Sequence, residues 1–340
     1  MGLGFGLELG FGSGLESELG LIKVGTSGWS YPEGPGTWNG LFYPPRGRGG
    51  FKATDELRYY AGHFDTVEVN STFYRPPAPA TARRWAAQTP PGFEFSVKLF
   101  QKFTHPGMVG RGVPARARPA GEERPLPDPT PQDLDEFREG IAPLAEAGRL
   151  GALLVQFPAG FRLDPRSKDY LVRVLEWFRD YPLAVELRHR SWSDEGDVTA
   201  EILAAAGAAL VQIDEPKFRF SIRQDRAPNV AARYYVRLHG RNAAQWWAHE
   251  SPDDRYNYLY SRQELQPVAE TITRVARSVG KTYLYLNNHY SAKAVVNATQ
   301  LKQMLDVPIE GEFPEELVEA YPELRGVVRT ASASDRPSGR

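Results

Sequence analysis

Apolar and polar residues alternate along residues 66–70 of this chain. Val67 and Val69 fall on one face and Glu68 and Asn70 on the other, which is the period of a β-strand. The same split recurs in seven other short stretches, each followed by a polar residue at its carboxyl end. A closed parallel barrel explains this repetition, because the carboxyl ends of all its strands meet at one mouth.

Eight strands are predicted along the chain, and helical stretches separate most of them. The strands are predicted at residues 22–27, 66–70, 93–98, 152–156, 183–188, 209–214, 234–239 and 283–287. Between them apolar residues recur at helical spacing, for example near residues 79–88, 197–206 and 292–305. The alternation predicts a single (β/α)₈ TIM-like barrel with right-handed crossovers. We expect its helix-facing residues to include Val67, Val69, Val97, Val185, Leu187, Val211, Val236 and Leu238.

Helix ends carry recognisable signals in several places. Thr54 is predicted to cap the first helix, and Thr130 to cap a helix with Pro131 in its first turn. Asp164 and Pro165 begin another helix in the same way. Gly280 is predicted to end the helix before the last strand.

The barrel is predicted to occupy residues 21–325. Residues 1–20 repeat glycine with Leu or Phe and read as a flexible leader, and residues 326–340 read as a polar tail. Residues 106–131 contain seven prolines and no periodicity, which is typical of a long functional loop. Because this insertion follows the third strand, we expect it to overhang the same face as Glu68 as a lid.

Composition narrows the classes of partner. The chain has 340 residues, of which 41% are apolar, and no apolar run long enough to span a membrane. Lysine plus arginine number 41 against 42 acidic residues, so extended nucleic-acid binding is not expected. The absence of cysteine excludes disulfides and thiolate metal sites. We therefore expect a cytoplasmic protein with a small-molecule partner, and the sequence leaves the oligomeric state open.

Polar side chains at the strand ends form the candidate site. Three acids face three bases and a histidine there. One interpretation is a self-neutralising network that plugs the barrel, since buried charges have to be paired. The carboxyl-end location favours a site instead. The set is Ser27, Glu68, Asn70, Lys98, Gln156, Glu186, Arg188, Asp214, Arg237, His239, Asn287 and Asn288.

The acids are the predicted catalytic residues. Glu68 and Glu186 lie on the second and fifth strands, and opposed carboxylates suit general acid/base work such as glycoside hydrolysis. We take Glu186 as the acid or base, with Arg188 one strand period away setting its protonation. Asp214 is grouped with them as a third carboxylate. The alternative is that each glutamate is a salt-bridge partner of a neighbouring base.

The remaining set is predicted to bind substrate. Asn70, Gln156 and Asn287 would bind substrate hydroxyl groups through hydrogen bonds. Trp29 and Tyr74 would stack on a ring of the substrate. The bases suit a phosphate or carboxylate, although no Gly-rich phosphate loop accompanies them. The other binding candidates are Ser27, Lys98, Arg188, Arg237, His239 and Asn288.

No cofactor is predicted, and a divalent metal stays an open alternative. Carboxylates and His239 at the strand ends are possible ligands. However, no His-x-His or His-x₃-His spacing occurs. Further candidates in loops beyond the strands are His105, His189 and His289.

Several longer motifs resemble the YecE-like family, a bacterial and archaeal domain of unknown function. The resemblance runs from about residue 22 to 305. It implies a TIM-like barrel and gives no established reaction. The motifs are Gly-Thr-Ser-Gly-Trp-Ser-Tyr at 25–31, Trp-Asn-Gly-Leu-Phe-Tyr-Pro at 38–44, Glu-Val-Asn-Ser-Thr-Phe-Tyr at 68–74, Gln-Phe-Pro at 156–158, Glu-Leu-Arg-His at 186–189 with Ser-Trp at 191–192, Arg-Leu-His-Gly-Arg at 237–241 and Asn-Asn-His at 287–289.

Together these patterns favour a hydrolase- or lyase-type enzyme acting on a small polar substrate, a carbohydrate or nucleotide derivative. One alternative is a non-catalytic binding protein for a small anionic or sugar-like ligand. Another is a metal-dependent isomerase or endonuclease-like barrel. Separated carboxylates around an open pocket would favour the enzyme, whereas a mutually hydrogen-bonded set would favour binding or a structural role.

Overall fold

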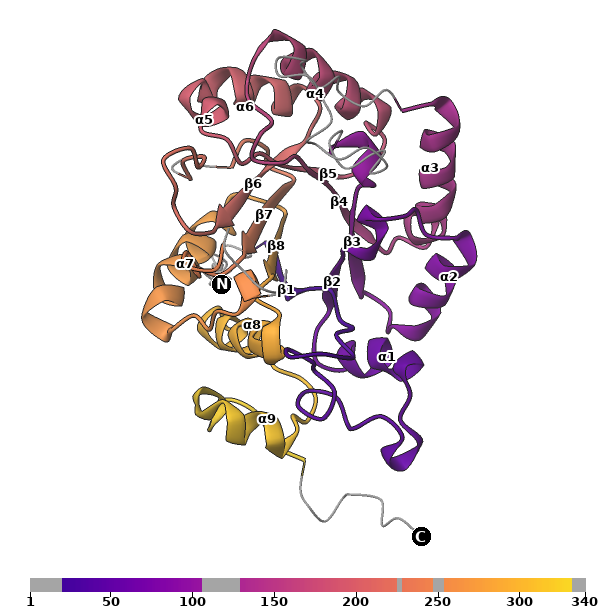
Figure 1. The fold of residues 1–340 in the computed structure, drawn as a ribbon, viewed down its shortest axis with the longest axis vertical. Coiled ribbons are helices and arrows are strands. Elements are labelled where there is room, and N and C mark those ends of the chain that lie inside the picture. Colours follow the sequence, from indigo (N-terminus) through magenta and orange to yellow (C-terminus); the bar gives the residue numbers. More distant parts are fainter. Residues whose placement is uncertain (1–19, 106–128, 225–227, 247–253, 332–340) are drawn as a thin grey trace, which may run out of the picture.

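Eight parallel strands close into one barrel (Figure 1). The structure, a computed structural model, describes residues 20–105, 129–224, 228–246 and 254–331. Neighbours in the barrel follow chain order, and β8 pairs with β1, so the predicted TIM-like fold is confirmed. The strands are β1 (Leu21–Ser27), β2 (Thr66–Val69), β3 (Glu94–Lys98), β4 (Leu150–Gln156), β5 (Leu183–Glu186), β6 (Ala209–Asp214), β7 (Arg233–Leu238) and β8 (Lys281–Leu286).

Helices surround the strands, and α9 lies outside this ring beside α8 (Figure 1). They are α1 (Glu56–Tyr60), α2 (Pro79–Gln88), α3 (Pro131–Glu146), α4 (Pro165–Trp177), α5 (Ser191–Asp194), α6 (Gly196–Ala205), α7 (Arg262–Val275), α8 (Lys293–Met304) and α9 (Glu315–Ala320). Short 3₁₀ segments lie at Arg48–Gly50, Ala53–Asp55, Ser71–Phe73, Gln101–Phe103, Asp254–Tyr256, Tyr290–Ala292 and Pro322–Leu324.

Two of the predicted helix ends are confirmed and two are wrong. Thr130 and Asp164 cap α3 and α4, each accepting from a backbone N–H in the first turn. Thr54 instead lies inside a 3₁₀ turn before α1. Gly280 follows the end of α7 by several residues, and its N–H donates to the Ala231 carbonyl at 2.9 Å. Gly280 therefore joins the segment that precedes β8 to the segment that precedes β7.

Most of the predicted strand register is confirmed. Glu68, Glu186 and Arg237 meet inside the barrel, so the valines and leucines beside them face the helices. Ser96 accepts a hydrogen bond from the interior Tyr285, which places Val97 outward as predicted. The outward residues confirmed in this way are Val67, Val69, Val97, Val185, Leu187, Val236 and Leu238.

The register predicted for β6 is wrong. Val211 pairs with Tyr235 of β7, and the Tyr235 hydroxyl reaches Glu68 in the interior. Paired residues of adjacent strands point to the same side, so Val211 lines the interior rather than the helices. The cause is visible in the sequence, because residues 208–211 are all apolar and do not distinguish the two faces.

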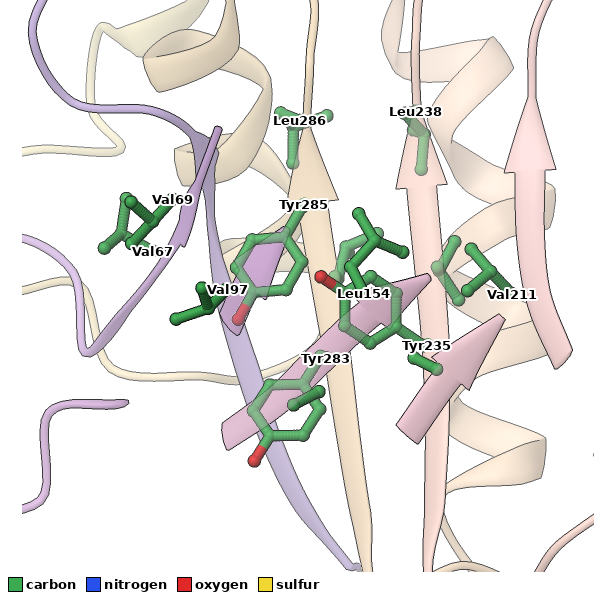
Figure 2. Close-up of a cluster of buried hydrophobic side chains, with 14 of the residues drawn as sticks. Val67, Val69, Val97, Leu154, Val211, Tyr235, Leu238, Tyr283, Tyr285 and Leu286 are labelled. Carbon is green, nitrogen blue, oxygen red and sulfur yellow. The ribbon is translucent and has the colours of Figure 1, made fainter. Parts of the chain in front are cut away.

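Three tyrosines from β7 and β8 fill the middle of the barrel (Figure 2). Tyr235, Tyr283 and Tyr285 lie with ring centroids 5.2 to 6.2 Å apart. The Tyr285 hydroxyl bonds Thr66 at 2.6 Å and Ser96 at 2.9 Å, and Tyr283 donates to Glu94. This layer fills the barrel below its carboxyl-end mouth and forms the floor of that mouth.

The carboxyl-terminal part of the fold extends further than predicted. The Phe313 N–H donates to the Arg329 carbonyl at 2.8 Å, and the Ala331 N–H donates to the Phe313 carbonyl at 3.2 Å. Residues 326–331 are thus joined to the body by hydrogen bonds. The predictions for the leader, for nearly all of the lid and for the end of the tail fall on residues 1–19, 106–128 and 332–340, outside the described residues. None of the helices in the described part has the length and apolar character needed to cross a membrane.

Candidate functional site at the barrel mouth

Arg237 of β7 is the centre of the polar cluster at the mouth. Its Nη2 donates to Glu68 Oε1 at 2.6 Å, and its Nη1 donates to Glu186 Oε2 and to Gln156 Oε1, the latter at 2.9 Å. Arg237 and both glutamates are completely or almost completely buried. The fold therefore gathers the predicted strand ends of β2, β4 and β5 on one guanidinium.

Glu68 is fixed to the barrel floor. Besides the bond from Arg237, it accepts from the Ser27 hydroxyl at 2.9 Å and from the Tyr235 hydroxyl at 2.7 Å. Both carboxylate oxygens thus accept hydrogen bonds from buried donors. These contacts hold Glu68 in place and leave it little freedom to approach a substrate.

Glu186 is held as an anion by two arginines. Arg188 Nε donates to its Oε1 at 2.6 Å, and Arg237 donates to its other oxygen. Burial alone would raise the pKa of Glu186, but the charges of Arg237 and Arg188 hold that pKa well below its usual value. Glu186 is therefore ionised at neutral pH and cannot donate a proton as a general acid.

Arg188 connects Glu186 to two further side chains. Its Nη1 lies 3.5 Å from Glu215 Oε2, and its Nη2 lies 3.1 Å from His239 Nε2. Because a guanidinium only donates, Nε2 accepts and the His239 proton is on Nδ1. Asn287 Nδ2 lies 2.8 Å from Nδ1, so the side-chain amide has to turn over to place its oxygen beside that proton. Burial, with the charges of both arginines, lowers the pKa of His239 to about 3, so the ring is neutral.

Lys98, the last residue of β3, is the exception in this network. Its Nζ lies 4.0 Å above the centroid of the Phe73 ring. Among the described residues it has no hydrogen-bond or ion-pair partner. Burial and the charge of Arg237 lower the pKa of Lys98 to about 7, against the opposing pull of Glu186 and Glu68. A partly neutral amine therefore stands beside two arginines that are each paired with a carboxylate.

His105, which lies near Lys98, and Glu215, which contacts Arg188, were not predicted as substrate-site residues. Burial, followed by the charge of Lys98, lowers the pKa of His105 to about 3. The His105 ring meets Phe73 edge to face with centroids 4.8 Å apart, and its Nδ1 lies 2.9 Å from Thr104 Oγ1. Burial raises the pKa of Glu215, the inward-facing residue after β6. The position of Glu215 directly after Asp214, at the end of a strand, was the available signal.

Asp214 does not belong to this cluster. It pairs in register with the outward-facing Leu238, and so it faces away from the interior. Its carboxylate accepts from Arg241 Nε and Nη2 at 2.8 and 2.7 Å and from the Tyr260 hydroxyl at 2.9 Å. The expectation that Asp214 faces the mouth is therefore wrong, for the same reason as the β6 register.

Other predicted binding residues lie around the mouth or hold its loops. Trp29 is half-buried with its ring edge-on to Trp85 of α2, whereas Tyr74 is 68% exposed. Asn70 Oδ1 is buried without a hydrogen-bond partner among the described residues. Asn288 donates to the Tyr258 carbonyl and to Asn297 Oδ1, both at 2.8 Å, and so ties the loop after β7 to α8.

The candidate metal ligands are not gathered together. Within the described ranges, no group of three His, Asp or Glu side chains is placed to hold a metal ion. His189 contacts Ser191 Oγ at 2.9 Å, and the His289 ring stacks on Tyr31 with centroids 4.2 Å apart. Neither histidine joins the carboxylates at the mouth. That no cofactor is needed stays a prediction.

Two known proteins resemble the chain, one over most of its length and the other over about half of it. The UPF0759 protein YunF of Bacillus subtilis (strain 168) is 26% identical over 309 residues, which cover 87% of this chain and 99% of YunF. The UPF0759 protein YecE of Escherichia coli (strain K12) is 28% identical over 179 residues, 52% of each chain.

Solved structures agree with these relatives. A DUF72 family protein (TM1631) from Thermotoga maritima MSB8 is 34% identical with a TM-score of 0.68, covering 84% of this chain and 99% of its own. Another (EF0366), from Enterococcus faecalis V583, is 25% identical with a TM-score of 0.69 and coverages of 85% and 97%. Residues 23–318 match the family described as "Protein of unknown function DUF72", and the chain belongs to that family.

Proposed function

We propose that this protein is a hydrolase- or lyase-type enzyme that binds a small polar substrate with an anionic group at the barrel mouth. Lys98 exchanges a proton with the substrate, and Arg188 binds the anionic group. The observation that carries the proposal is the unpartnered Lys98 amine among the described residues, beside two arginines at the carboxyl ends of the strands.

The lysine suits proton transfer better than either glutamate. A general acid or base works best when its pKa is near the operating pH, and the pKa of Lys98 is about 7. Glu186 is ionised by its two arginines, and Glu68 already accepts three hydrogen bonds. A carboxylate with so low a pKa is fully ionised and is also a weak base, so we replace the predicted acid or base role of Glu186 by a role in positioning Arg188 and Arg237.

A glycosidase-type carboxylate pair is not favoured. In such enzymes the sugar lies between two carboxyl groups about 5 to 9.5 Å apart. Here Glu68 and Glu186 bind the two terminal nitrogens of the same guanidinium, so Arg237 occupies the space between them. This leaves lysine-assisted chemistry, rather than carboxylate-assisted glycoside cleavage, as the mechanism we propose.

A non-catalytic binding protein is the second candidate. The observation that favours it is the mutual hydrogen bonding among the buried Glu68, Glu186 and Arg237 and the partly buried Gln156. In that case Arg188 and Lys98 would hold an anion without turnover. The two candidates share a ligand class and differ in what the Lys98 amine does.

The test begins with thermal shift of the purified protein against sugars, sugar phosphates and nucleotides, with and without divalent metals. A ligand that binds only the native state raises the melting temperature. Turnover of each hit is then compared for wild type, Lys98→Met and Lys102→Met. Lys102 is a matched control, because it is paired with Asp133 at 2.6 and 2.7 Å outside the cluster.

For the enzyme, we expect Lys98→Met to lower turnover by about two to four orders of magnitude while Lys102→Met does not. Binding without turnover by the wild type would select the binding protein. Full turnover by the folded Lys98→Met variant would contradict the proposal.

A further inference from the structure

We infer that Lys98 is a nucleophile: its amine condenses with the carbonyl group of a substrate that also carries a carboxylate or phosphate, and forms an imine. This inference rests on the proposed function and narrows its substrate class. It assigns to Lys98 a covalent bond in addition to the exchange of a proton.

The first step of the argument is that this amine is free to react. A lysine nucleophile needs its nitrogen lone pair, and burial near other cations supplies the neutral form. Lys98 Nζ contacts the Phe73 ring at 4.0 Å, and the charges of Arg237 and Arg188 disfavour its protonation. The face of the Phe73 ring supports one side of the amine and attracts its ammonium form weakly, but it offers no hydrogen-bond acceptor.

Other buried or partly exposed lysines are held differently. Each of them donates to a carbonyl or carboxylate oxygen, and such a bond stabilises the charged form. They are Lys23 on the Gly92 carbonyl at 2.8 Å, Lys102 on Asp133 at 2.6 Å, Lys281 on Glu94 at 2.8 Å and Lys302 on the His63 carbonyl at 3.0 Å. Lys98 alone, among these five lysines of the described chain, lacks such a partner.

An anion site accompanies the amine. The Arg188 side chain is 18% exposed, and its charge acts on Lys98. Its Nε is committed to Glu186, whereas its Nη1 contact with Glu215 is a long 3.5 Å. Nη1 therefore has donor capacity for an incoming carboxylate or phosphate, the groups that arginine binds best.

Condensation balances without a further reactant. The Lys98 nitrogen attacks the carbonyl carbon, the N–C bond forms, and the C=O π electrons move to oxygen. The nitrogen then loses its protons and the oxygen leaves as water, which gives the imine without any oxidation or reduction. The nitrogen lone pair closes the C=N bond, and the two protons that leave nitrogen depart with the carbonyl oxygen as water, so no other proton donor or acceptor is consumed.

The experiment is reductive trapping on the full chain with sodium cyanoborohydride. Two anionic carbonyl probes, pyruvate and dihydroxyacetone phosphate, are each matched by the neutral analogue that lacks the anion, acetone and dihydroxyacetone. The adduct is weighed by intact-protein mass spectrometry and located by peptide mapping. Wild type, Lys98→Met and Lys102→Met are compared at pH 8.

We expect one adduct, at Lys98, formed at least about tenfold faster than at any other lysine, because most of its amine is neutral at pH 8 whereas ordinary lysines are almost fully charged. At least one anionic probe should label faster than its neutral analogue. Preference for pyruvate or for dihydroxyacetone phosphate would identify the anion. Lys102→Met should label normally, and Lys98→Met should lose the adduct.

Scattered labelling of exposed lysines, or an adduct elsewhere that survives in Lys98→Met, would overturn the inference. Equal labelling by charged and neutral probes would overturn its anion site. The position of the adduct in the wild-type protein tests the inference even if a variant folds poorly. Turnover that depends on Lys98 without any trapped imine would overturn the nucleophile and leave the proposed proton transfer standing, so the two failures are distinguishable.

Discussion

Arg237 of β7 and Glu68 of β2 form a buried ion pair inside the barrel, with Nη2 2.6 Å from Oε1. Neither side chain has appreciable contact with solvent. Such a pair contributes little net stability compared with apolar packing, but removal of one partner leaves an uncompensated buried charge. A single substitution at either residue is therefore expected to destabilise the barrel near its carboxyl-end mouth.

Arg237→Met should destabilise the protein by about 3 to 5 kcal/mol, because Glu68 and Glu186 both lose a charged partner. Urea denaturation followed by circular dichroism gives the free energy of unfolding. The double variant Glu68→Gln/Arg237→Met should recover part of this loss. A loss below about 1 kcal/mol in the single variant would mean that water reaches the pair.

Glu186→Gln should lower both the stability of the protein and the pKa of Lys98. Arg188 and Arg237 lose a charged acceptor, and Lys98 loses a negative charge that favours its ammonium form. The rate of Lys98 reductive methylation, followed against pH by peptide mapping, reports that pKa. A Glu186→Gln variant that keeps wild-type stability and this pH profile but loses turnover would restore Glu186 as the acid or base.

The barrel fold could be predicted from the sequence. Period-2 alternation on β2, β5 and β7 specifies which residues face the helices, and the structure follows it. On β6 the apolar run before Gln212 has no such alternation, and the same error displaced both Val211 and Asp214. Register is encoded locally only where one face is clearly polar.

The composition of the site was predictable, but its pairing was not. Strand-end position brought Glu68, Gln156, Glu186 and Arg237 together correctly. Which carboxylate is paired and which base is left free depends on side-chain geometry across the barrel. Lys98 therefore looked like one cation among three, and only its position over Phe73 distinguishes it.

Asp214→Asn tests the placement of Asp214 outside the mouth. The substitution weakens two bonds from Arg241 and one from Tyr260, so we expect a loss of about 1 to 3 kcal/mol. Reductive trapping at Lys98 should be unchanged under conditions where the variant is folded. A selective loss of trapping or of turnover, with stability intact, would bring Asp214 back to the site.

Gly25→Ala tests the close approach between β1 and β2. An added Cβ would lie 2.2 Å from the Thr66 carbonyl oxygen of the neighbouring strand, closer than atoms can pack. We expect a loss of at least about 3 kcal/mol or failure to fold, because backbone on both sides has to shift. Gly160→Ala is the control, since its Cβ would meet nothing within 4 Å. Equal stability of the two variants, measured by thermal unfolding, would contradict the packing of β1 against β2.

Lys98→Met should stabilise the protein at neutral and acidic pH and lose this effect in alkali. The pKa of Lys98 is about 7 in the folded state and 10.5 when unperturbed. Between these values the unfolded chain binds more protons, so wild-type stability rises as pH rises from 7 to 10.5. Below that range both states are charged, and the folded state bears the cost of holding a partly buried ammonium ion near two arginines.

Methionine removes this cost and keeps the length and apolar character of the side chain. At pH 6 the variant should therefore be more stable than wild type by about 2 to 4 kcal/mol, and at pH 11 the difference should shrink towards zero. Urea denaturation at several pH values measures it. Lys102 is partly exposed and paired with Asp133, so Lys102→Met should show no such gain at pH 6. If the free energies of wild type and Lys98→Met ran parallel from pH 6 to 11, Lys98 would titrate as an ordinary lysine, and its amine would be charged whenever a substrate arrived.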